Sequence, residues 1–258
     1  MAIEPLYSLA GLAVGMLVGL TGVGGGSLMT PLLVLAFGFH PATAVGTDLL
    51  YAAATKSVGT AVHGHGGTVD WTVVRRLASG SVPATVVTLT VLACLGAGIG
   101  GAQHVITVTL GIALVATAVA MLFRGRLVAR FGHSLDGLSE AGIARLTVLL
   151  GGILGVLVSL SSVGAGALGM TALLILYPRL PINRLVGSDI AHAVPLTLIA
   201  GAGHWAMGSV DLGLLASLLI GSVPGIVAGS LLSTRVSDRA LQPILAGTLA
   251  VVGGRLIF

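Results

Sequence analysis

Apolar residues follow one another in long runs along most of the 258-residue chain, interrupted by short stretches of glycine, proline and polar residues. Several runs approach or exceed the roughly 20 residues that a helix needs to cross a bilayer. Three longer runs occur in each half, at residues 42–63, 77–98 and 105–123, and at residues 185–204, 212–232 and 240–255. Two shorter runs precede each set, at residues 6–20 and 27–39, and at residues 143–158 and 167–177. We therefore predict an all-α integral membrane protein with about 8–10 membrane segments.

Composition excludes a water-soluble fold. Hydrophobic residues make up 55% of the chain and charged residues 8%, and the mean hydropathy is +1.09, whereas about a quarter of the residues in a soluble domain are charged. Most basic residues lie between the apolar runs, which is typical of positive-inside loops and argues against a nucleic-acid partner. Cys94 is the only cysteine, which rules out an intramolecular disulfide and a cysteine-rich metal site. We also predict no resident metal and no cofactor. The first five residues lack the positive region of a cleaved signal peptide, and we expect them to remain in the mature protein.

The chain contains an internal duplication. Residues 18–41 align with residues 158–181, and after one inserted residue the same alignment continues. Identical residues then recur in order, pairing Gly46 with Gly187, Asp48 with Asp189, His63 with His204, Asp70 with Asp211 and Pro83 with Pro224. A run of this kind indicates two copies of one unit. We predict a first transmembrane repeat at residues 1–123, a cytoplasmic linker at 124–141 and a second transmembrane repeat at 142–258.

The shorter runs predict half-helices. Each would reach roughly 20 Å, less than the roughly 30 Å hydrocarbon core. We expect each pair to meet at a Gly-rich break inside the membrane and to return to the face that it entered. Only that arrangement places the arginines on one face; they are Arg75, Arg76, Arg124, Arg126, Arg130, Arg145, Arg179, Arg184, Arg235 and Arg239. With three full spans per half, the repeats would be inverted and both termini would lie outside, a plan that recurs in secondary transporters.

The two Gly-rich breaks are candidate substrate sites. They read TGVGGGS at residues 21–27 and SSVGAGA at residues 161–167. Each opens a helix whose first N–H groups lack partners, and glycine lets a ligand approach the backbone, so a small anion suits them. The alternative is that these glycines only permit tight helix packing. The candidate binding residues are Thr21, Gly24, Gly25, Gly26, Ser27, Ser161, Ser162, Gly164 and Gly166.

Charged residues inside apolar runs are the second group of candidates, because they are costly in a membrane. Asp48 and Lys56 are eight residues apart and share a helix face, and Asp189 and His192, three residues apart, do the same. Lys56 could hold a negative substrate or release a proton; the alternative is a structural ion pair with one aspartate. The candidate binding residues of this group are Thr47, Asp48, Lys56, Ser188, Asp189 and His192.

Two histidines occupy equivalent places in the repeats. His63 and His204 could titrate near neutral pH, so they join Asp48 and Asp189 as proton-coupling candidates. A capping role at the following loop is the alternative. The duplicated aspartates at positions 70 and 211 are predicted to cap the helices that follow them.

At these residues the chain resembles the sulfite exporter TauE/SafE family of bacterial and archaeal membrane proteins. The resemblance covers both repeats and rests on Pro31-Leu-Leu after the first break, Ala44-Val-Gly-Thr47, His63 with Gly67-Thr-Val-Asp-Trp71, and Gly80-Ser-Val-Pro83. It implies export or uptake of small sulfur-containing anions such as sulfite, sulfoacetate or other organosulfonates. The family usually has a small polar residue where this chain has Asp48 and Asp189. Two carboxylates repel an anion unless they are protonated or paired, so they predict either a proton-coupling element or a substrate other than a simple anion.

We therefore expect a secondary transporter, not an enzyme, in the cytoplasmic (inner) membrane of a bacterium or archaeon. An alternative cargo is a different small molecule or a divalent metal bound by Asp48, Asp189 and His192. A more remote alternative is an intramembrane hydrolase that uses Ser27 or Ser162 with a histidine base. The expected partners are a small anionic substrate and the lipid bilayer, and a homodimer is left open.

Overall fold

The computed structural model describes residues 4–21, 26–65, 67–95, 101–132, 137–232 and 238–257. These residues form α-helices joined by turns, and no strand occurs among them. The helices of the first repeat are α1 (Pro5–Thr21), α2 (Gly26–Leu35), α3 (Pro41–His65), α4 (Trp71–Cys94) and α5 (Gly101–Phe131). Their equivalents in the second repeat are α6 (Glu140–Ser161), α7 (Ala167–Leu176), α8 (Ile182–Ala206), α9 (Leu212–Leu232) and α10 (Asp238–Ile257). The predicted all-α architecture is confirmed.

Five of the described helical stretches are long and apolar enough to cross a membrane. They are Trp71–Cys94, His104–Phe131, Glu140–Ser161, Ile182–Ala206 and Leu212–Gly229. Large apolar side chains on these helices, among them Val87 and Leu149, remain exposed on the outside of the molecule, where lipid would cover them. The chain is therefore a multi-pass membrane protein, as its hydropathy predicted.

α5 and α6 are among the helices that extend beyond the apolar runs that predicted them. α5 continues past residue 123 into the predicted linker, and the Arg126 guanidinium lies 5.6 Å from the centre of the Phe123 ring. α6 begins at Glu140, because the Ser139 hydroxyl caps it by accepting the N–H of Gly142 at 3.2 Å. Its 22 residues extend about 33 Å, so α6 is longer than the half-helix expected from residues 143–158. In both helices polar residues prolong the helix beyond the apolar run, which hydropathy alone does not detect.

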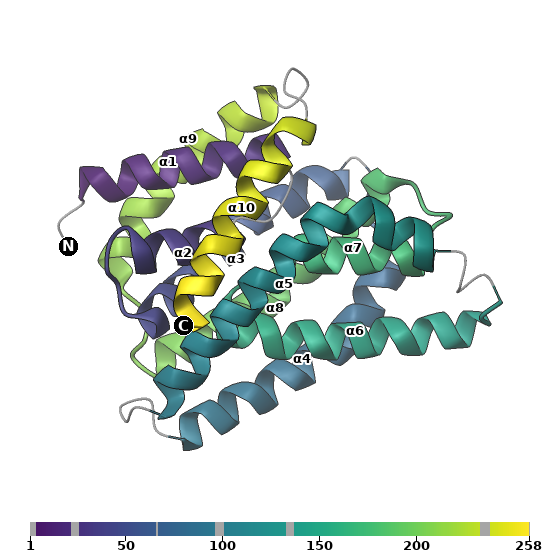
Figure 1. The fold of residues 1–258 in the computed structure, drawn as a ribbon, viewed down its shortest axis with the longest axis horizontal. Coiled ribbons are helices and arrows are strands. Elements are labelled where there is room, and N and C mark those ends of the chain that lie inside the picture. Colours follow the sequence, from purple (N-terminus) through teal and green to yellow (C-terminus); the bar gives the residue numbers. More distant parts are fainter. Residues whose placement is uncertain are drawn as a thin grey trace.

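The two halves interlock. α1 packs on α9 and α6 packs on α4 (Figure 1), so the first helix of each repeat pairs with the fourth helix of the other. Glycines let the backbones touch: Gly11 lies against the carbonyl of Leu218, and its equivalent Gly151 lies against the carbonyl of Leu77. Small residues at membrane helix contacts have this function. Helix packing therefore accounts for these glycines.

α3 and α8 pack against each other at the centre of the molecule, and they are equivalent helices of the two repeats. Gly46, near the start of α3, lies against His204, near the end of α8, whereas Gly59 on the second half of α3 lies against Ile190 on the first half of α8. The two helices are therefore antiparallel. Opposite directions of equivalent helices support inverted repeats, and the orientation of each half across a membrane stays a prediction.

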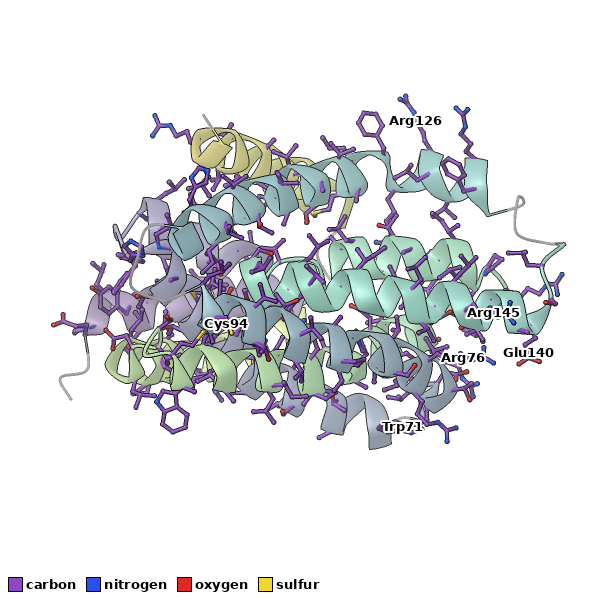
Figure 2. The ribbon with its side chains drawn as sticks, turned by 90° about the horizontal axis from the view of Figure 1, so that it is seen from below. Trp71, Arg76, Cys94, Arg126, Glu140 and Arg145 are labelled. Atoms are coloured by element: carbon purple, nitrogen blue, oxygen red, sulfur yellow. The ribbon has the colours of Figure 1, made fainter. Side chains whose placement is uncertain are left out.

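One end of the molecule gathers charged side chains. Arg76, Arg126, Glu140 and Arg145 lie at one end in Figure 2, and Cys94 lies toward the other. An ion pair of 3.1 Å between Arg76 and Glu140 joins α4 to α6 at that end. The start of α1 and the end of α10 lie toward the opposite end (Figure 1). Arg255, in the last turn of α10, lies apart from this group, and the membrane orientation of the termini stays a prediction.

Candidate functional site

Four titratable side chains lie buried on the facing helices α3 and α8. The exposed fractions are 0% for Asp48, 8% for Lys56, 5% for Asp189 and 0% for His192. Lys56 interacts electrostatically with the other three. The structure thus brings together the residues that sequence analysis singled out as costly inside a membrane. Because a buried charge is tolerated only with compensating partners, those partners determine what the site can do.

Asp48 is held by hydroxyl groups. The Thr30 hydroxyl on α2 donates to Asp48 Oδ2 at 2.5 Å. The Ser162 hydroxyl lies near enough to interact with the same carboxyl, but Asp48 Oδ1 and Ser162 Oγ are both buried and make no hydrogen bond of ordinary geometry to the described residues. The carboxyl therefore retains one oxygen for a proton, a water molecule or a ligand.

Lys56 reaches from the first repeat into the second. Its Nζ donates to the backbone carbonyl oxygen of Ala165 at 3.2 Å. Ala165 belongs to the second break, residues 161–167. Within the described part of the chain, Lys56 forms no direct ion pair with either aspartate. The ammonium group therefore contacts backbone at the break and interacts with the two aspartates through their charges, without a direct ion pair.

Asp189 lies against the start of α7. A Cβ atom added at Gly169 would come within 2.7 Å of Asp189 Oδ1, so the glycine lets α7 approach the carboxyl. Asp189 Oδ1 is buried without a hydrogen-bond partner among the described residues. No hydroxyl group equivalent to that of Thr30 is hydrogen-bonded to this carboxyl in the described structure.

The second break and the first turn of α7 face Asp48, Lys56 and Asp189. Ser162 has a left-handed φ of 58°. Gly164 and Gly166 have φ of 130° and 133°, and these two values strongly favour glycine. After this turn α7 lies beside α6 instead of extending its axis (Figure 1). Ser162 faces Asp48, the Ala165 carbonyl faces Lys56, and Gly169 in the first turn of α7 faces Asp189. The break is therefore part of the charged site.

The other predicted residues of the breaks either bond to the local backbone or lie outside the described structure. The Ser161 hydroxyl donates to the Leu157 carbonyl at 2.6 Å and accepts the Val163 N–H at 3.2 Å, so it serves the local backbone. Thr21 lies at the end of α1, and Gly26 and Ser27 lie at the start of α2. The surroundings of these three residues are outside the described part. Gly24 and Gly25, and the side chain of His63, are outside it as well.

His192 and Tyr51 occupy equivalent positions in the two repeats. His192 Nε2 forms a 2.8 Å hydrogen bond with Ser81 Oγ on α4. Tyr51 interacts with Ser222 on α9, which is the repeat equivalent of Ser81. His204 instead forms a 2.8 Å hydrogen bond from Nε2 to the Ser159 carbonyl, which is typical of a structural contact between α8 and α6. Of the histidines with described side chains, His192 is the one in electrostatic contact with Lys56.

Thr47 and Ser188 have a role that sequence reasoning missed. The Thr47 hydroxyl accepts the backbone N–H of Asp211 at 3.1 Å, and the Ser188 hydroxyl accepts the backbone N–H of Asp70 at 2.8 Å. Each bond joins one half to the loop of the other. The Asp70 carboxyl accepts N–H bonds from Thr72 and Val73, and Asp211 caps α9 in the same way, so the predicted helix caps are confirmed. The signal in the sequence is that both repeats have a hydroxyl residue at the equivalent positions 47 and 188 and an aspartate at the equivalent positions 70 and 211.

We expect Ser188→Ala to destabilise the protein by about 1–3 kcal/mol, because the Asp70 N–H loses its acceptor. Ser79→Ala is the matched control, since in the described structure its exposed hydroxyl bonds to the Arg76 carbonyl of its own helix and to no other element. Thermal unfolding of the purified proteins in detergent measures both. Equal midpoints for the two variants would mean that the hydroxyl bond between the halves contributes nothing.

The alternatives from the sequence gain no support at this site. No group of three or more His, Cys, Asp or Glu side chains that could hold a metal occurs among the described residues. His192 Nε2 is bonded to Ser81, and no hydrogen bond joins Ser162 Oγ to a histidine in the described structure.

Comparison with known proteins finds relatives along nearly the whole chain. Residues 7–256 match the family described as sulfite exporter TauE/SafE. A probable membrane transporter protein of Bacillus subtilis strain 168, YjnA, is 40% identical over 250 residues, covering 96% of this chain and 98% of that protein. A probable membrane transporter protein of Xylella fastidiosa strain 9a5c is 29% identical over 234 residues, covering 87% of this chain and 82% of that protein. No solved structure matches the chain.

Proposed function

Because the chain belongs to the sulfite exporter TauE/SafE family, we propose that it is a secondary transporter that moves a small sulfur-containing anion, such as sulfite or an organosulfonate, across the cytoplasmic membrane. The family and the names of the relatives indicate a membrane transporter and not an enzyme. The substrate class is inferred from the position of Lys56, whose buried ammonium group lies at a backbone break between the halves.

Lys56 and the second break together offer donors to an oxyanion. An ammonium group has three N–H donors, and one bond, to the Ala165 carbonyl, is formed within the described structure. α7 starts at Ala167 without a side-chain cap, so its first N–H groups and the positive end of its dipole add to the same region. A tetrahedral or pyramidal sulfur oxyanion has several acceptor oxygens in a small volume, which matches such a set.

Charge balance favours coupling to protons. Lys56 neutralises one of the two buried aspartates, so an anion entering the site would meet one uncompensated carboxylate unless that carboxyl carries a proton. A transporter built this way moves its anion together with a proton. The departure of Asp48 and Asp189 from the small polar residues usual in the family is then part of the coupling.

The membrane orientation follows from charge. The end that carries Arg76, Arg126 and Arg145 (Figure 2) is assigned to the cytoplasm by the positive-inside rule, which leaves both termini outside. Inverted repeats would then present the site alternately to the two faces.

Flux into proteoliposomes tests this function. We expect radiolabelled sulfite and sulfoacetate to enter liposomes that contain the purified protein faster than protein-free liposomes, and to enter faster still when the outside is more acidic. Sulfoacetate is included because, unlike sulfite, it forms no neutral gas that leaks through lipid in acid. Excess unlabelled sulfonate should compete, and zinc or manganese should not. Uptake of both anions at the protein-free rate would contradict the proposed substrate class.

A further inference from the structure

We propose that Asp48 is the carboxyl that binds and releases the transported proton, and that Asp189 is the standing counter-ion of Lys56. The proposal rests on the proposed function for its role in transport, but the protonation of Asp48 can be measured without a substrate. Asp48 and Asp189, which are equivalent in the duplication, would then have different roles.

Lys56 interacts more strongly with Asp189 than with Asp48. α3 and α8 are antiparallel, and Gly59 lies against Ile190, so Lys56 and Asp189 are about one helical turn apart across the pair. Asp48 and Lys56 are separated by eight residues on one helix, about 12 Å. The backbone at the second break supports the same assignment. Lys56 bonds to Ala165 in the break, and Asp189 faces Gly169 just after it. The Gly169 N–H bonds to the Gly164 carbonyl at 3.0 Å, so the two contacts lie close together along the backbone.

The groups around Asp48 suit a carboxyl that changes its protonation state. The Thr30 and Ser162 hydroxyls can each donate or accept a hydrogen bond, so they can pair with either the acid or the carboxylate. The titratable groups in electrostatic contact with Asp48 in the described structure are Lys56 and Tyr51, both on α3. α8 brings Asp189 and His192 toward Lys56, and α9 brings the hydroxyl of Ser222 toward Tyr51.

The repeats differ at these partners. The position equivalent to Thr30 is Met170, and the position equivalent to Ser162 is Gly22. The hydroxyl groups around Asp48 are therefore not duplicated around Asp189. Lys56 is not duplicated either, since Thr197 occupies its equivalent position. The sequence itself thus distinguishes a carboxyl with switchable hydroxyl partners from a carboxyl with a lysine.

The charge of the site changes by one unit in this scheme. With the proton on Asp48, the acid, the ammonium group and the Asp189 carboxylate sum to zero, and an anion can bind at Lys56. When the proton leaves Asp48 for water on the other face, the O–H bond breaks, the site becomes negative, and the anion is expelled. One proton therefore accompanies each anion.

Infrared difference spectroscopy of the purified protein tests the assignment without a substrate. We expect the carbonyl band of a protonated carboxylic acid at neutral pH in the wild type, its loss in Asp48→Asn and its retention in Asp189→Asn. Ser162→Ala should shift the band, because it removes a hydrogen-bond partner. If Asp189→Asn does not fold, the double variant Lys56→Gln/Asp189→Asn removes both charges and should still show the band.

The outcomes separate the two proposals. A band that survives in Asp48→Asn, that disappears only with Asp189, or that is missing from the wild type overturns the assignment of Asp48. A band that behaves as expected in a protein that transports neither sulfite nor sulfoacetate leaves the proton site standing and contradicts the proposed substrate.

Discussion

Replacing Lys56 by glutamine is expected to reduce the uptake of sulfite and sulfoacetate in proteoliposomes to the protein-free rate. The ammonium group at the second break is the proposed anion ligand, and glutamine keeps much of its length without its charge. The variant should also be less stable by about 3–5 kcal/mol, because the buried Asp189 carboxylate loses the strongest of its favourable charge interactions. Flux measurements and thermal unfolding of the same preparation record the two effects.

A double variant separates these effects. Lys56→Gln/Asp189→Asn should regain much of the lost stability, since no unbalanced charge remains, but it should not regain transport. Lys56→Arg keeps the charge and should retain stability better than Lys56→Gln. Full transport by Lys56→Gln would remove Lys56 from the anion site, whatever its effect on stability.

Replacing Gly80 by leucine is expected to prevent α4 and α6 from packing. The Cα of Gly80 faces the carbonyl of Val148 so closely that any Cβ atom would overlap backbone, which cannot move aside as a flexible side chain can. The cost should exceed the roughly 1–3 kcal/mol usual for an overpacked core, because the whole helix pair must separate. Gly221→Leu should have the same effect on α1 and α9, since Gly221 faces the carbonyl of Ser8.

Gly125 on α5 provides the matched control. Apart from the backbone of α5 itself, no atom of the described residues lies within 4 Å of a Cβ added there, so Gly125→Leu should behave as the wild type. The measurement is the fraction of detergent-solubilised protein that elutes as a single monodisperse species in size-exclusion chromatography. A monodisperse Gly80→Leu protein with an unchanged unfolding midpoint would contradict the close packing of α4 and α6.

The sequence is most informative where a single physical penalty is large. Charge in hydrocarbon is so costly that Asp48, Lys56 and Asp189 stand out without any structure, and the structure buries all three on facing helices. Duplicated aspartates before two apolar runs predicted helix caps, and both caps are formed. Each of these predictions depends on a local pattern and one strong physical penalty.

Pairings between distant residues could not be predicted in the same way. Hydropathy does not reveal that Thr47 accepts a bond from Asp211, because a hydroxyl in a membrane helix usually bonds to its own backbone. It also does not reveal that Lys56 bonds to Ala165 in the opposite repeat. These contacts depend on the register between α3 and α8 and on the turn of the second break, which exist only after the halves interlock.

Binding of sulfite to the purified protein, measured by calorimetry at neutral pH for the wild type and Lys56→Gln, tests the central claim most directly. The central claim is that Lys56 and the second break form an anion site between the two halves. The wild type should bind with one site per chain, and Lys56→Gln should bind at least about tenfold more weakly, a loss of about 1.4 kcal/mol. Equal affinity of the two proteins for sulfite would contradict the claim.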